Sequence, residues 1–112
     1  MANSITVKVT IESSDFSGDD IGMPIYAPIR CEDGFTISVQ ANRFAYCTPR
    51  IDQGHHTHYE CGNPSTVPLS TSFKTYAETT DYINTVYAYV PKNVLMEELA
   101  LHGGIKQGGV PE

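Results

Sequence analysis

Tryptophan is absent from this 112-residue sequence, and arginine occurs only three times. No stretch approaches the ~20 consecutive apolar residues that a membrane-spanning helix needs. The opening segment, MANSITVKVTIE, lacks the basic and then apolar pattern of a secretory signal peptide. From these absences we expect a soluble, intracellular protein with no membrane partner.

Positive charge is scarce overall. Seven Lys and Arg residues stand against thirteen Asp and Glu residues, which gives a net charge of −6. An acidic chain repels phosphate backbones, so direct nucleic-acid binding is not expected. The acidic residues are scattered along the chain, and this favours solvated loops and helix faces over a surface that mimics nucleic acid.

Paired cysteines are also missing. The chain holds three cysteines, Cys31, Cys47 and Cys61, and none of them forms a C-x-x-C pair. An odd number of cysteines fits reduced thiols in a cytosol better than the disulfide framework of a secreted domain.

Alternating apolar and polar residues predict several β-strands. Residues 4–12 alternate strictly, with Ile and Val on one face. Residues 29–40 resemble a hairpin in which Asp33-Gly34 forms a two-residue turn with positive φ angles. The segment HHTHYEC (55–61) and residues 84–90 are further strands, the latter with its tyrosines on the face opposite to Val and Ala.

One helix is predicted near the C-terminus. It begins at Pro91, whose fixed φ suits the first helical turn, and it ends at Gly103-Gly104. Leu95 and Leu99 form its apolar stripe, whereas Glu97 and Glu98 are expected on the outer face. A helix of this length is marginal alone, so it must pack against the sheet.

The elements together predict an α+β fold, in which one C-terminal helix packs on a face of an antiparallel sheet of four to five strands. Residues 1–104 are expected to form a single domain, and residues 105–112 a flexible C-terminal tail.

Chemically versatile side chains concentrate in residues 30–61, which contain every arginine, every cysteine and three of the four histidines. On a strand, His56 and His58 leave the same face, and with Cys61 they would supply zinc ligands at irregular spacing. The alternative is a polar, histidine-rich loop with buried thiols. We therefore expect no cofactor, and zinc is the one cofactor that remains possible.

A nucleophilic cysteine is the next hypothesis. Cys47 lies close in sequence to Arg43 and Arg50, which would favour its thiolate. A working nucleophile also needs an oriented base and an oxyanion site, and the sequence identifies neither. We therefore expect no catalytic residues and no enzymatic activity, with the cysteines buried as small apolar side chains.

Two kinds of binding surface remain. Arg43, Tyr46 and Arg50 interleave guanidinium and aromatic groups, which suits a small phosphorylated ligand or a partner protein. The alternative is that these arginines pair with nearby carboxylates. The seven tyrosines exceed what one small core needs, and tyrosine with arginine is typical of protein interfaces. The predicted binding residues are Arg43, Tyr46, Arg50, Tyr59, Tyr87 and Tyr89.

Two blocks resemble small, mostly uncharacterised proteins encoded by tailed bacteriophages and prophages. They are residues 29–50, IRCEDGFTISVQANRFAYCTPR, and residues 85–105, TVYAYVPKNVLMEELALHGGI. The resemblance is carried by CEDGFTISVQA in the first block and by VYAYVP and HGG in the second. The HHTHYEC segment lies outside both blocks. No established activity accompanies this resemblance, so it implies no catalytic residue.

The resemblance implies a phage protein that acts on the host. We expect a non-enzymatic protein in the host cytoplasm that binds a host protein complex and inhibits a defence component, as anti-CRISPR proteins do. The alternative is a binder of small anionic ligands that sequesters a nucleotide signal. A zinc-stabilised module and a minor virion component are further alternatives. An exposed sheet edge with tyrosines would also permit a homo-oligomer.

Overall fold

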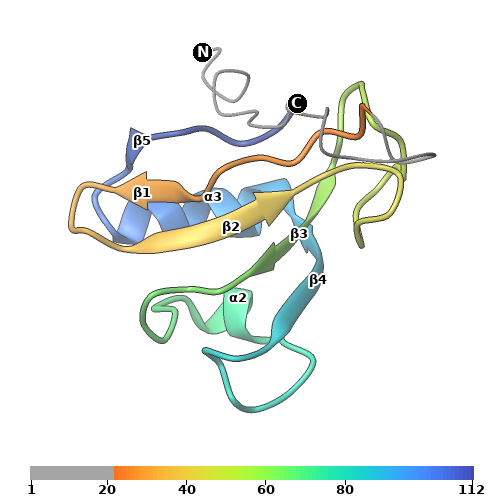
Figure 1. The fold of residues 1–112 in the computed structure, drawn as a ribbon. Coiled ribbons are helices and arrows are strands. Elements are labelled where there is room, and N and C mark those ends of the chain that lie inside the picture. Colours follow the sequence, from red (N-terminus) through yellow and green to blue (C-terminus); the bar gives the residue numbers. More distant parts are fainter. Residues whose placement is uncertain (1–21) are drawn as a thin grey trace.

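The computed structural model describes residues 22–112, which form a five-stranded antiparallel sheet in the order β4-β3-β2-β1-β5 (Figure 1). The α+β class and the helix packed on one sheet face are thereby confirmed. The predicted strand over residues 4–12 lies outside the described part of the chain. The elements are β1 Ile29–Cys31, β2 Thr36–Gln40, β3 His58–Gly62, α2 Thr71–Lys74, β4 Val86–Pro91, α3 Lys92–Leu101 and β5 Ile105–Gln107.

The core lies between the sheet and α3, which runs behind β1 and β2 in Figure 1. Alternate residues of β2 and β3 face this core, so that Val39 and Tyr59 are buried while their neighbours are only partly covered. From α3, the core receives Leu95 and Leu99, which confirms the predicted apolar stripe. Among residues 22–112, no helix has both the length and the apolar character needed to cross a membrane.

The β1–β2 hairpin is present, but its turn differs from the expected one. Between the hydrogen-bonded residues Cys31 and Phe35 lie three residues, Glu32 to Gly34, and of these only Gly34 has a positive φ, at 97°. The amide of Gly34 donates to the carbonyl of Cys31 at 3.0 Å, and the amide of Cys31 donates to that of Phe35 at 2.8 Å. This is the geometry of a three-residue loop, a turn followed by a left-handed glycine.

A β-bulge in β4 breaks the expected alternation of tyrosines. Tyr59 pairs with Val90 and Cys61 pairs with Tyr87, so two residues of β4 stand opposite one residue of β3. Tyr89 absorbs the extra residue with a φ of 53°. The bulge buries Tyr87 and exposes Tyr89, although strict alternation would have placed both on one face.

The C-terminal residues are part of the fold, so the predicted flexible tail is wrong. Residues Ile105–Gln107 form β5, which pairs with β1 at the edge of the sheet. Further along, the hydroxyl of buried Tyr59 donates to the carbonyl of Pro111 at 2.7 Å. The C-terminal residues pack on the fold because they provide a pairing strand for β1 and a hydrogen-bond acceptor for the buried hydroxyl group of Tyr59.

The end of α3 provides a matched pair of substitutions. Gly103 and Gly104 have φ values of +90° and +89°, which cost an L-residue roughly 1–2 kcal/mol. A Cβ added at Gly103 would lie 3.0 Å from the Cβ of Glu32, whereas at Gly104 it would meet nothing within 4 Å. We therefore expect Gly103→Ala to lower the free energy of unfolding more than Gly104→Ala in denaturant titrations. Equal losses would contradict the close approach of α3 to the hairpin turn.

Candidate functional site

The two sequence blocks that were singled out above meet in space. The turn after β1 lies against the residues that follow α3. The amide of Glu32 donates to the carbonyl of Gly104 at 2.9 Å, and the amide of Asp33 donates to that of His102 at 3.1 Å. These backbone contacts hold the end of α3 against the hairpin.

His102 occupies the centre of this contact and is only 4% exposed. Its Nδ1 lies 2.7 Å from the Oδ2 of Asp33, and its Nε2 lies 2.7 Å from the Oε2 of Glu98. The ring of Phe35 stacks on the imidazole, with centroids 3.7 Å apart and planes tilted by 4°. We call Asp33, Phe35, Glu98 and His102 the histidine junction.

Glu98 is completely buried, so its predicted position on the outer face of the helix is wrong. Besides His102, it accepts the amides of Leu69, at 2.9 Å, and of Ser70, at 2.7 Å. Ser70 is the N-cap of α2, because its hydroxyl accepts the amide of Phe73. A buried carboxylate needs such partners, and Glu98 obtains them by joining α3 to the start of α2.

Asp33 is the exposed member of the histidine junction, and its side chain is 48% exposed. The pKa of this carboxyl is lowered by the backbone amide of Phe35, which donates to Oδ1 at 2.9 Å, and then by the hydrogen bond with His102. Beside it is an open hollow of about 340 Å³, whose wall includes Leu69.

The histidine junction is poorly arranged for catalysis. Both nitrogens of His102 are engaged by carboxyl oxygens at 2.7 Å, so neither is directed toward a substrate. The neighbouring Cys31 thiol is buried, and desolvation followed by the charge of Asp33 raises its pKa to about 11. Its thiolate is therefore disfavoured at neutral pH.

The predicted zinc ligands are not brought together. Both nitrogens of His56 are bonded to backbone carbonyls, those of Ile51 and Glu112. The Nδ1 of His58 lies 2.7 Å from the hydroxyl of Thr57, and Cys61 is buried in the core. Within residues 22–112, no group of three His, Cys, Asp or Glu side chains is arranged to hold a metal ion.

Cys47 is also unsuited to nucleophilic chemistry. Its side chain is 1% exposed, and Sγ donates to the carbonyls of Asn42 and Pro49. Burial raises the pKa of this thiol, and the opposing effect of Arg50 is smaller. The expectation that neighbouring arginines would favour the thiolate is therefore wrong, because desolvation outweighs their charge.

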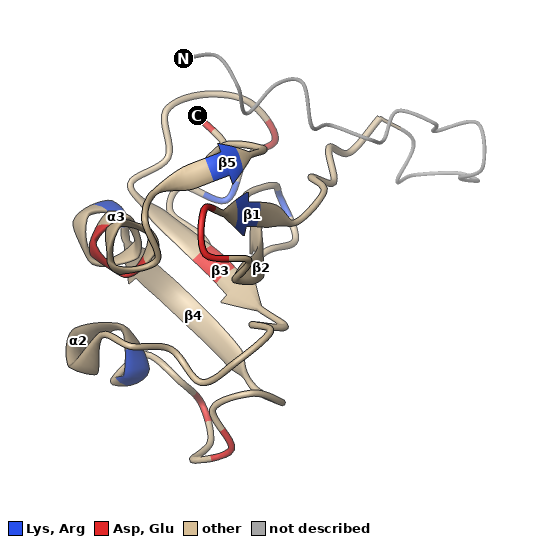
Figure 2. Ribbon diagram, turned by 90° about the vertical axis from the view of Figure 1, so that its left-hand side faces the viewer, with Lys and Arg blue, Asp and Glu red and all other residues tan. Residues whose placement is uncertain are grey.

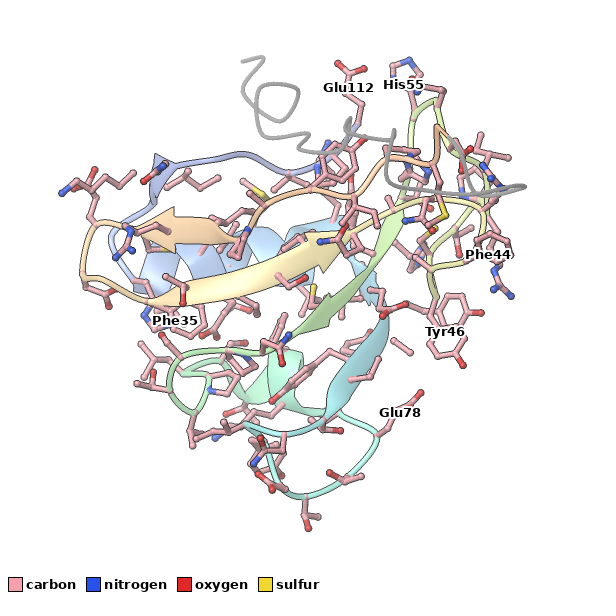
Figure 3. The ribbon with its side chains drawn as sticks, viewed as in Figure 1. Phe35, Phe44, Tyr46, His55, Glu78 and Glu112 are labelled. Carbon is pink, nitrogen blue, oxygen red and sulfur yellow. The ribbon has the colours of Figure 1, made fainter. Side chains whose placement is uncertain are left out.

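A second candidate site lies on the loop that follows β2. Tyr46 and Tyr89 stack with ring centroids 5.9 Å apart, and the guanidinium of Arg50 lies 5.8 Å from the centre of the Tyr46 ring. Phe44 is 56% exposed, Tyr46 41% and Tyr89 40%. We call Phe44, Tyr46, Arg50 and Tyr89 the aromatic–arginine surface. Phe44 and Tyr46 project from this loop at the opposite side of the molecule from Phe35 (Figure 3).

Buried polar groups fix the backbone beneath these rings. Asn42 is 5% exposed, and its Oδ1 accepts the amides of Phe44, at 2.9 Å, and Ala45, at 2.8 Å. The amide of Tyr46 donates to Glu60 at 2.8 Å, and the amide of Tyr89 donates to the carbonyl of Tyr46 at 3.1 Å. The exposed rings are therefore held on an anchored loop.

Of the six predicted binding residues, three meet on this surface: Tyr46, Arg50 and Tyr89. The guanidinium of Arg43 lies over Phe44 and forms an ion pair with Asp52. Tyr59 and Tyr87 are fully buried, and burial raises the pKa of each hydroxyl to about 12. The prediction that these two tyrosines contact a partner is therefore wrong, because they are core side chains.

The sequence did not predict the histidine junction, because most of its reactive side chains lie in residues 30–61. His102 and Asp33 are 69 residues apart, and only the fold brings them together. The sequence did contain one signal, because Asp33 lies in the CEDGF motif of the first block and His102 in the HGG motif of the second. Glu98 carries the additional signal of being four residues before His102 on one helix.

Comparisons with protein-family models, curated proteins and solved structures found no match to this chain.

Replacing His102 tests how far the fold relies on the histidine junction. His102→Ala would leave the buried carboxyl group of Glu98 without its side-chain partner, and we expect a loss of about 3–5 kcal/mol in the free energy of unfolding. The matched control is His55→Ala on an exposed loop, for which we expect less than about 0.5 kcal/mol. Chemical denaturation measures both, and similar values would contradict the role of the junction.

The lowered pKa of Asp33 predicts that this residue makes a pH-dependent contribution to the stability of the fold. Its folded-state pKa lies below the unfolded value of ~3.9. The stabilisation is therefore complete at neutral pH and is lost as the pH falls through the folded pKa. The melting temperatures of the wild type and Asp33→Asn should differ at pH ~7 and converge as the pH falls below ~3.9. Glu32→Gln, beside it on the exposed turn, is the control. A difference that stays constant in acid would contradict the prediction.

Proposed function

We propose that this protein is a non-enzymatic binding protein that engages a partner protein through the aromatic–arginine surface. The observation that carries the proposal is the backbone of Tyr89. A left-handed conformation costs a bulky L-residue roughly 1–2 kcal/mol, and glycine would avoid the cost. Burial of the ring does not offset it, since the side chain is 40% exposed. The bulge that strains Tyr89 also buries Tyr87, and it directs the ring of Tyr89 outward onto Tyr46. Strained backbone positions cluster at sites that bind or act on another molecule.

The composition of the surface supports the proposal. Tyrosine and arginine, together with tryptophan, are enriched among the residues that dominate binding energy at protein interfaces. Here the rings of Tyr46 and Tyr89 stack and Arg50 lies over one of them, so little side-chain entropy remains to be lost on binding.

The chemistry of the remaining reactive groups supports binding over turnover. Both nitrogens of His102 already face carboxylates, and the thiols of Cys31 and Cys47 have raised pKa values. A small-anion binder is the second candidate. It is less favoured because an anion at Arg43 would compete with the carboxylate of Asp52.

A phage setting, which the resemblance of the two blocks implies, gives the partner a biological class. In that setting the protein would act in the host cytoplasm and inhibit a component of a host defence complex, in the manner of an anti-CRISPR protein. The net charge of −6 is consistent with a partner that is a protein and not a nucleic acid.

Tyr89→Gly separates binding from stability. Removing the left-handed cost offsets the loss of the ring contact with Tyr46, so the free energy of unfolding should stay within about 1 kcal/mol of the wild type. In a pull-down from lysate of a bacterium with an active CRISPR system, a partner protein retained by the wild type should fall about 10-fold or more.

Lys106→Ala is the matched control for this pull-down. Lys106 is an exposed residue of β5, which lies at the opposite edge of the sheet from β4. The control should retain the partner at the wild-type level. Equal retention by Tyr89→Gly and the wild type would contradict the proposed function.

A further inference from the structure

We infer that the partner presents a carboxylate side chain to Arg50 and an adjacent apolar side chain to the hollow beside Phe44, as an acidic peptide segment would. This inference rests on the proposed function and adds the chemistry of the ligand. It follows from the N–H donors of Arg50 that form no hydrogen bond within residues 22–112, from the lining of the hollow, and from the charge of the whole chain.

Arg50 is an exposed cation that forms no ion pair within residues 22–112. One of its nitrogens, Nη2, donates to the carbonyl of Phe44 at 3.0 Å. The Cζ of Arg50 lies 5.8 Å from the centre of the Tyr46 ring, and a guanidinium carries five N–H donors in its plane. The donors that are not bonded to Phe44 can therefore take both oxygens of a carboxylate.

The aromatic residues around Arg50 strengthen such an ion pair. Phe44, Tyr46 and Tyr89 would shed water when a partner covers them, and a charge pair that is partly removed from water is stronger than an exposed one. The neighbouring arginine differs, because Arg43 already has Asp52 as its counter-ion.

An open hollow of about 230 Å³ adjoins this surface and shares Phe44 as a lining residue. Its apolar lining comes from Met23, Ile25, Phe44 and Ala45. Glu60 also lines it, so a carboxylate placed there would meet a like charge. The hollow therefore suits the apolar side chain of a partner, and the acidic side chain is directed to Arg50.

A protein carboxylate fits this surface better than the phosphates of a nucleic acid. Phosphate backbones require several cations in a row, whereas basic and acidic residues are interspersed over the ribbon in Figure 2. A single acidic side chain needs only one guanidinium and faces less repulsion from a chain of net charge −6.

A bead library of random dodecapeptides tests the inference, with the full-length wild-type protein as the labelled probe. We expect the enriched peptides to combine Asp or Glu with a neighbouring aromatic or aliphatic residue. Changing that acid to its amide in a synthetic peptide should weaken binding about 10- to 100-fold, as measured by fluorescence anisotropy. Arg50→Ala should weaken binding similarly, and Lys106→Ala should leave it unchanged. A labelled dodecathymidylate is the nucleic-acid probe and should not bind.

The outcomes separate the inference from the proposed function. Peptides that lose binding to Tyr89→Gly but show less than a 2-fold effect of the acid-to-amide change would overturn the inference and leave the binding surface in place. Enrichment of basic or neutral peptides alone, no enrichment at all, or binding of the dodecathymidylate would also overturn it. Acidic peptides that bind Tyr89→Gly and Arg50→Ala as well as the wild type would refute both.

Discussion

A buried carboxylate and its histidine hold the described fold together. Glu98 has no exposed surface, and it is tolerated there because His102 and two backbone amides at the start of α2 satisfy it. His102 extends the connection to Asp33 on the hairpin turn. Three segments far apart in the sequence are therefore joined by one series of hydrogen bonds, and removal of His102 leaves the buried carboxyl group of Glu98 without its side-chain partner.

With the histidine junction at one side, the opposite side of the molecule presents the aromatic–arginine surface. The bulge in β4 links this surface to the core. It directs Tyr87 inward and turns Tyr89 outward onto Tyr46. The core therefore gains an aromatic side chain, and the surface gains one at the cost of a strained backbone. The histidine junction thus stabilises the fold, whereas the aromatic–arginine surface is the one for which we propose a binding role.

Local signals in the sequence were sufficient for part of this structure. Periodicity and turn residues gave the hairpin, β4 and the helix with Leu95 and Leu99 facing the sheet. These signals failed where contacts between distant segments determine whether a side chain is buried or exposed. Glu98 looks like a solvated helix residue until the start of α2 packs against it and the amides of Leu69 and Ser70 reach its carboxylate. Tyr89 looks like a regular strand residue until pairing with β3 introduces the bulge. No local pattern encodes either contact, because each depends on the pairing of distant segments.

We propose that a partner binds at the aromatic–arginine surface and not at the histidine junction. Hydrogen–deuterium exchange of the protein, alone and with the partner that it retains from lysate, distinguishes these two sites. We expect slower exchange on binding in residues 42–50 and 87–90, with residues 31–35 and 98–104 unchanged. Protection confined to residues 31–35 and 98–104 would contradict it.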